Sequence, residues 1–336
     1  MGATHTHAHQ ALNHLRKQSQ YLLSQSIAPS TKKNYNSALR SFHFFCNHYS
    51  IPPYPPSEQT LILYATHISS YSSHSNVKLH MAAVKHSTVI QGHQVDFRPF
   101  QRLYLLLRGI KRAEGKKFSL PKRFPITPDI LATIRENLFN SSILYEDKLM
   151  LWAAITTAFF GFLRVSEYTS THKTKYDPQC TLTCEDLSLT RGIANIVIKA
   201  SKTDPFRHGM TIRLAANDSL LCPINALREY LSVHPSHTGP LFTYQNNKFL
   251  TRKDINQILH RTTNGLANTT SHSLRIGAAT TAAAMGCPKW LIMSLGRWSS
   301  DCFRRYIRIS DHAIINTSEV LANCTNPITQ TFYPYE

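Results

Sequence analysis

The sequence predicts a mainly helical protein with one small antiparallel β-sheet, and three observations support this. Apolar residues recur at helical spacings of three and four through most of the 336 residues. Between Leu182 and Leu214 the pattern changes to short β-rich runs separated by turn residues. Residues 115–125 form a basic segment rich in helix breakers, which divides the chain. At this length we expect two domains, each with its own core.

The first third of the chain is predicted to form a small helical bundle. Ser30 is a candidate cap for a helix in which apolar residues recur over positions 35–49. The proline-rich residues 51–56 end that helix, and Ser57 opens the next one. Further helices are expected at residues 10–25, 76–90 and 99–113. The polar residues at the N-terminus, before the first of these helices, are interpreted as a flexible tail.

The remainder is predicted to combine helices with a three-stranded antiparallel sheet. The strands are residues 187–189, 193–198 and 210–214, and Arg191 with Gly192 supplies the first turn. Thr251 and Asp254 form a capping box at the start of one helix. Helices are expected at residues 128–138, 145–163, 223–233, 252–266, 274–285, 288–295 and 300–308.

The positive charge is concentrated in the first third of the chain. The protein has 37 Lys+Arg against 19 Asp+Glu, a formal net charge of +18. Residues 1–124 hold 16 of these bases and 3 of the acids, a net +13, which favours a module that holds a polyanion. The candidate nucleic-acid contacts are Lys32, Lys33, Arg40, Lys78, Lys85, Arg102, Arg108, Lys111, Arg112, Lys116, Lys117, Lys122 and Arg123.

Several classes of protein are disfavoured by the sequence. Residues 1–10 lack the apolar core of a secretory signal, and the apolar run 149–163 is too short for a membrane span. The seven cysteines are scattered, which favours a reducing compartment, and Cys180 and Cys184 lack the second pair of a zinc site. No glycine-rich phosphate loop is present. We therefore expect an intracellular protein without a membrane partner, metal or cofactor.

Three arginine-bearing segments and one turn lysine stand out. The segment GFLRVSE carries Arg164, SHSLRIGAAT carries His272 and Arg275, and LGRWSSDCFRRYIR places Tyr306 among further arginines. Lys202 lies in SKTD, between the second and third strands. Each residue alone is better explained structurally, as a helix-dipole partner, a cap, a packed aromatic or a solvated hairpin tip. Their order and spacing together outweigh those explanations.

In that order and spacing the segments resemble the tyrosine recombinase, or phage integrase, superfamily, with Cre-like members and the recombinases of Crypton- and DIRS-type mobile elements closest. The resemblance implies a helical, SAM-like core-binding domain at residues 26–114 and an α+β catalytic domain at 126–325. Residues 115–125 are the linker, 1–25 an N-terminal tail with the first helix, and 326–336 a C-terminal tail. The implied catalytic residues are Arg164, Lys202, His272, Arg275, Trp298 and the nucleophile Tyr306, with Glu167 in support.

One spacing departs from the family pattern. Trp298 precedes Tyr306 by eight residues, one fewer than the family's usual nine, and counting back nine reaches Arg297. The run Trp-Ser-Ser resembles the family's His-Ser-Ser, so we favour Trp298 for the His/Trp position, with Arg297 as the alternative.

The chemistry of these residue types agrees with the resemblance. A tyrosine that attacks a phosphodiester needs cations or a base beside it. Arg164 and Arg275 can grip two phosphate oxygens, His272 can act as a base or hydrogen-bond donor, and Lys202 as the acid. Because the phosphotyrosyl ester conserves the bond energy, rejoining needs neither ATP nor metal.

The resemblance implies a site-specific recombinase or integrase of mobile-element type that acts on double-stranded DNA as a homotetramer. It also implies a nuclear location, by analogy with eukaryotic mobile elements, and a C-shaped clamp around the duplex. Residues 311–323 would pack on a neighbouring protomer. Two alternatives stay open: a transposon-derived DNA-binding protein without catalysis, and, less favoured, a type IB topoisomerase.

Overall fold

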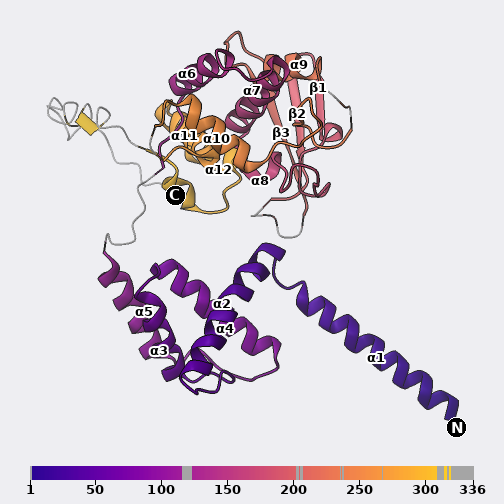
Figure 1. Ribbon diagram of the computed structural model, residues 1–336, viewed down its shortest axis with the longest axis vertical. Helices are drawn as coiled ribbons and strands as arrows, with labels where there is room; N and C mark the ends of the chain where they lie inside the picture. Colours follow the sequence, from indigo (N-terminus) through magenta and orange to yellow (C-terminus); the bar gives the residue numbers. More distant parts are fainter. Residues whose placement is uncertain are drawn as a thin grey trace, which may run out of the picture. The chain divides into compact units, whose positions relative to one another are not determined.

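The computed structural model describes residues 2–115, 123–201, 204, 207–234, 236, 238–266 and 268–308, together with 314, 315 and 318. The chain divides into two compact units, Met1–Leu120 and Pro121–Glu336 (Figure 1). The described residues are mainly helical and include a three-stranded antiparallel sheet. The predicted fold class is therefore confirmed.

The first unit is helical in its described part. Its core contains Phe42, Tyr64, Ile68, Val77 and Val84, all fully buried. Helix α2 packs against α4, and α3 against α5. The helices are α1 (Gly2–Ser24), α2 (Pro29–His48), α3 (Glu58–Ser69), α4 (His74–Ile90) and α5 (Gln101–Glu114).

Two details of the first unit correct the expectations from sequence. Helix α2 begins at Pro29 after Ala28, so Ser30 lies inside the helix and is not its cap. Helix α1 extends back to Gly2, so the expected N-terminal tail is wrong; this stretch contains no proline, and alanines recur in it. The predicted cap at Ser57 is confirmed, because its hydroxyl accepts a hydrogen bond from Thr60 N at 3.1 Å.

The second unit is built around helix α7, whose residues from Leu149 to Phe159 are all buried. Helices α6, α9 and α11 pack against it, and in Figure 1 it lies between the sheet and α10–α12. The helical elements are α6 (Pro128–Phe139), α7 (Tyr145–Phe160), α8 (Val165–Tyr168), the 3-10 helix η1 (Cys184–Asp186), α9 (Pro223–Leu231), α10 (Arg252–Thr262), α11 (Ser271–Ala284), α12 (Lys289–Gly296) and the 3-10 helix η2 (Asp301–Arg305).

The sheet has the predicted strands in the order β1 (Leu187–Thr190), β2 (Ile193–Ile198) and β3 (Met210–Ala215), all antiparallel. Ile196 lies opposite Leu187 on one side and Ile212 on the other. The buried face carries Ala194, Ile196, Ile198, Ile212 and Leu214, which belong to the core of the second unit.

Three element boundaries near the arginine-bearing segments differ from the expectation. Helix α7 ends at Phe160, because Phe162 adopts a positive φ of 49° and Leu163 N donates back to Ala158 O at 2.9 Å. Helix α11 begins at Ser271, which places His272 in its first turn. Within residues 300–308 the chain forms only the short 3-10 helix η2, Asp301–Arg305, instead of an α-helix. Residues 311–323 fall largely outside the described residues.

Gly277 allows the chain after the linker to lie directly on α11. A Cβ at this position would lie 1.7 Å from the carbonyl oxygen of Ile126, and Ile126 N donates to Ser273 O at 3.1 Å. Ile126 itself is fully buried. The close approach therefore fixes residues 123–127 against the helix that carries His272 and Arg275.

We predict that Gly277→Ala destabilises the second unit by about 1–3 kcal/mol, because the backbone at Ile126 must move. All three tryptophans lie in the second unit, so tryptophan fluorescence during urea unfolding measures its free energy of unfolding. Gly109→Ala is the control: nothing lies within 4 Å of its Cβ in helix α5, and the tryptophan transition should stay in place. An unchanged transition for Gly277→Ala would contradict the prediction.

Candidate active site

Arg164 is held at the start of α8 by the carboxylate of Glu167. It is the N-cap residue, and Glu167 Oε2 accepts its backbone N–H at 2.8 Å. Glu167 Oε1 accepts a second bond, from Arg164 Nη1, at 3.1 Å. The Glu167 side chain is only 2% exposed and that of Arg164 16%. One buried carboxylate therefore fixes both the backbone and the guanidinium of Arg164.

Arg275 is the largest fully buried side chain among the described residues. Its guanidinium donates to the carbonyl oxygens of Phe162 and Gly296, which belong to the loop after α7 and to the end of α12. Its Nε has no hydrogen-bond partner among the described residues. Burial and the charges of Arg164 and Arg297 lower the pKa of Arg275. A buried cation with an unused donor is suited to an anionic ligand.

Tyr306 and His272 lie side by side. Their ring centroids are 5.1 Å apart, and the Arg275 guanidinium lies 5.8 Å from the centre of the Tyr306 ring. Tyr306 directly follows η2, and its carbonyl accepts a hydrogen bond from Thr280 Oγ1 at 3.1 Å. A hollow of about 280 Å³ opens beside the phenol, lined by Arg123, His272, Ile276, Arg305, Tyr306 and Arg308.

The imidazole of His272 is neutral at pH 7. Burial lowers its pKa to about 4, assisted by the positive charges of Arg123 and Arg275. A neutral imidazole has a free lone pair and can accept a proton from a neighbouring hydroxyl.

Both residues considered for the His/Trp position belong to the site, but they face different ways. Arg297 ends α12 in the left-handed conformation, with φ 53° and ψ 47°. The Trp298 ring lies 4.5 Å from the Arg275 guanidinium and 4.8 Å from the Tyr306 ring. The Arg297 side chain instead reaches Glu167, with Nη2 2.6 Å from Oε2. A Cβ at Gly296 would lie 1.8 Å from the Trp298 ring, so only glycine fits before this turn.

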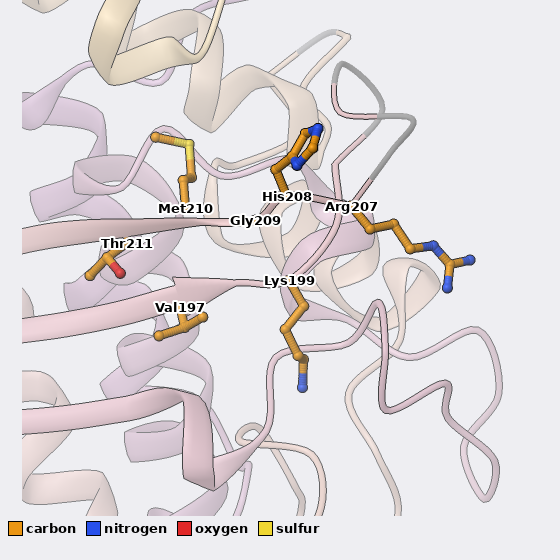
Figure 2. A pocket seen from close by; sticks show the side chains of 7 residues that line it. All are labelled: Val197, Lys199, Arg207, His208, Gly209, Met210 and Thr211. Atoms are coloured by element: carbon orange, nitrogen blue, oxygen red, sulfur yellow. The ribbon is translucent and has the colours of Figure 1, made fainter.

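The hairpin between β2 and β3 approaches the same region. Lys202 lies outside the described residues, but its neighbours Ser201 and Asp204 line a hollow of about 340 Å³ together with Arg297 and Trp298. Figure 2 shows Lys199, Arg207 and His208 on the strand ends around a second hollow, of about 350 Å³. Lys199 already pairs with Asp186 at 2.6 Å.

The described basic residues proposed for nucleic-acid contact are all exposed. Lys116, Lys117 and Lys122 lie outside the described residues. Arg123 also belongs to the candidate active site, which the sequence did not indicate. It lies beside His272 and lines the hollow at Tyr306. Its place in the basic linker gave no signal that it reaches α11. The sequence likewise gave no signal that the Arg297 side chain reaches Glu167.

Two kinds of feature are absent from the described residues. No helix in that part of the chain is long and apolar enough to cross a membrane. No group of three or more His, Cys, Asp or Glu side chains there is arranged to hold a metal ion.

We predict that Arg123→Gln raises the pKa of His272, because it removes one of the positive charges that disfavour the imidazolium. In the unchanged protein His272 should stay neutral down to about pH 5, well below the ordinary histidine range near 6.5. A histidine NMR titration, with His272→Asn for assignment, measures both values. Arg135→Gln on α6 is the control and should leave the titration unchanged. A His272 that titrates near pH 6.5 in the unchanged protein would contradict the assignment.

Sequence comparison gives one curated relative and no matching family model. An integrase/recombinase XerD homologue from Selenomonas ruminantium is 26% identical over 302 residues, which cover 85% of this chain and 83% of the relative.

Solved structures share the fold. A XerH site-specific recombinase bound to a palindromic difH substrate superposes with a TM-score of 0.61 at 14% identity, over 87% of this chain and 80% of that one. The Tn1549 transposon integrase in complex with transposon right-end DNA gives 0.60 at 15% identity, over 88% and 95%. A lambda integrase dimer bound to a core site gives 0.55 at 15%, over 88% and 76%. The chain is thus similar in sequence to an integrase/recombinase homologue, and it shares its fold with DNA-bound recombinases and integrases.

Proposed function

We propose that this protein is a site-specific DNA recombinase that cuts and rejoins DNA through a 3′-phosphotyrosyl ester at Tyr306. The single observation that carries the proposal is the convergence of Tyr306 with a neutral imidazole and a buried arginine. His272 lies 5.1 Å from the Tyr306 ring, and Arg275 lies 5.8 Å from it with an unused Nε donor. The relatives named above are recombinases and integrases, in agreement with this activity.

The proposed reaction is a transesterification at phosphorus. The Tyr306 oxygen forms a bond to the scissile phosphorus while the bond to the 5′-oxygen breaks, and His272 takes the phenolic proton. Arg164 and Arg275 bind the non-bridging oxygens, where negative charge grows in the transition state. Lys202 protonates the leaving 5′-oxygen. Attack by a 5′-hydroxyl on the tyrosyl ester reverses the sequence and rejoins a strand.

The hollow beside Tyr306 supports phosphate as the substrate group. Arg123, Arg305 and Arg308 line it together with His272 and Tyr306. Trp298 packs across both Arg275 and Tyr306, which holds the cation beside the nucleophile. Such an arrangement suits an anion that is both bound and attacked, as a phosphodiester is.

The first unit is proposed as the core-binding domain that holds duplex DNA by its phosphates. Its described candidate residues are exposed, including four on α5: Arg102, Arg108, Lys111 and Arg112. Strand exchange requires at least two cut duplexes in one complex, and we propose a tetramer for that step. The structural neighbours include a DNA-bound lambda integrase dimer.

A mobile-element origin is part of the proposal and is supported by the likeness to the Tn1549 transposon integrase. The closer relation to Crypton- and DIRS-type elements and the nuclear location stay predictions from the sequence motifs. The curated relative is bacterial.

We predict that Tyr306→Phe abolishes the covalent protein–DNA adduct and leaves DNA affinity unchanged, because only the attacking oxygen is removed. A duplex nicked just 3′ of the scissile phosphate releases a short fragment with a free 5′-hydroxyl. Loss of that fragment traps the adduct for detection on a denaturing gel. Tyr145→Phe is the matched control, since this exposed tyrosine at the start of α7 lies outside the site and should react normally. If the unchanged protein binds its cognate duplex but never forms an adduct, it is a binding module instead. Adduct formation by Tyr306→Phe would overturn the nucleophile assignment.

We also predict that Arg108→Gln and Lys111→Gln on α5 each weaken DNA binding and reduce its salt dependence. Loss of one phosphate contact lowers the slope of log affinity against log salt by about 0.9. Fluorescence anisotropy over a salt series measures the slope. Arg98→Gln is the control, because Arg98 is exposed but already paired with Asp96 at 2.9 Å. Equal slopes for all three variants and the unchanged protein would contradict a phosphate-binding role for α5.

A further inference from the structure

Glu167 is shared between two arginines from distant parts of the chain. Its Oε1 accepts from Arg164 Nη1 at 3.1 Å, and its Oε2 accepts from Arg297 Nη2 at 2.6 Å. The side chains of Glu167 and Arg297 are 2% and 5% exposed. Arg297 and Arg164 therefore share one buried carboxylate through different oxygens, and the position of each guanidinium depends on the other.

Arg297 also shares a hydrogen-bond acceptor with Arg275. The carbonyl oxygen of Phe162 accepts from Arg297 Nη2 at 3.1 Å and from Arg275 Nη1. A further bond runs from Arg297 Nη1 to Gly161 O at 3.3 Å. Through Glu167 and Phe162, Arg297 thus contacts the immediate partners of both arginines that we assign to the phosphate.

The backbone conformation at the end of α12 directs the Arg297 side chain towards Glu167. Its left-handed conformation is uncommon for a residue with a side chain and costs about 1 kcal/mol or more. Trp298 N donates back to Met293 O at 2.9 Å, which closes the turn. The turn sends neighbouring side chains apart, so that Arg297 reaches Glu167 while Trp298 packs on Tyr306.

The positive charges of the three arginines repel one another, so their positions depend on fixed anchors. Arg164 and Arg297 pair with one buried carboxylate, and the buried Arg275 lies near enough to feel the charges of all three, so the cluster carries excess positive charge. Like charges in a buried site repel, and without fixed anchors the arginines would move apart. Arg297 donates to the Glu167 carboxylate and to the carbonyl oxygens of Gly161 and Phe162, which anchors it within this cluster.

We propose that Arg297 is a positioning residue for DNA cleavage, which holds Glu167 and the Phe162 carbonyl so that Arg164 and Arg275 converge on one phosphate. This inference rests on the proposed recombinase function. Arg297 acts through Glu167 and the 161–164 loop, and the phosphate is contacted by the other two arginines.

The test is a double-mutant cycle on the rate of adduct formation with the nicked duplex, using the full chain at saturating protein. Arg297→Gln should lower the maximal rate by about 100-fold, the cost of a misplaced catalytic group. The protein concentration that gives half-maximal rate should stay the same. Glu167→Gln should also slow the reaction, and the Glu167→Gln/Arg297→Gln double variant should be no slower than the slower of the two single variants.

Other outcomes are decisive too. If the losses of the two single variants multiply in the double variant, Arg297 acts independently of Glu167 and the proposal is wrong. A wild-type rate in Arg297→Gln also overturns it. Failure of the unchanged protein to form any adduct counts against the recombinase function and is seen before any variant is compared.

Two variants separate positioning from folding. Arg297→Lys keeps the charge but lacks the planar fork, so it should recover part of the rate lost in Arg297→Gln. If Arg297→Gln fails to bind DNA or to show a cooperative thermal transition, the rate of Arg297→Lys decides: slower than wild type supports the proposal, and equal to wild type overturns it. Arg98→Gln removes an exposed arginine–carboxylate pair and should react at the wild-type rate.

Discussion

The carboxylate of Glu167 is the interaction on which the candidate site depends. Burying arginines is costly unless their charge and N–H groups are matched, and Glu167 supplies the negative charge for Arg164 and Arg297 at distances of 3.1 and 2.6 Å. The carbonyl oxygens of Phe162 and Gly296 satisfy donors of Arg275 in the same way. The loop after α7, helix α11 and the end of α12 are therefore held together by one polar network inside an apolar core.

The fold around this network brings the side chains of the candidate site together. Helix α7 is buried from Leu149 to Phe159, and the loop at its end carries Arg164 towards α11. Gly277 lets the backbone at Ile126 lie directly on α11, which brings Arg123 beside His272. The left-handed turn at Arg297 then directs Trp298 onto Tyr306. Each of these steps depends on a backbone conformation or close approach that only a few residue types permit.

The site combines a fixed cation with a neutral base. Burial removes water from both groups, but the consequence differs. Arg275 keeps a donor with no partner in the part of the chain that the structure describes, whereas His272 loses its proton at neutral pH. The neighbouring arginines that we propose to bind a phosphate also keep the imidazole neutral. In the proposed reaction one cluster of positive charge therefore serves both substrate binding and proton acceptance. The sequence similarity to an integrase/recombinase homologue and the shared fold agree with this proposal.

The sequence by itself determined the helical class, the strands of the sheet, the cap at Ser57 and the candidate residues from Arg164 to Tyr306, because helical periodicity, strand patterns, capping and motif order are local properties. It misplaced the cap at Ser30, the start of α1 and the last helix, where local preferences are weak. Only the tertiary structure decided that Trp298 contacts Tyr306 while Arg297 turns to Glu167, and that Arg123 reaches His272. These contacts join residues up to 149 positions apart, and side-chain direction at a left-handed turn depends on packing that no sequence spacing records.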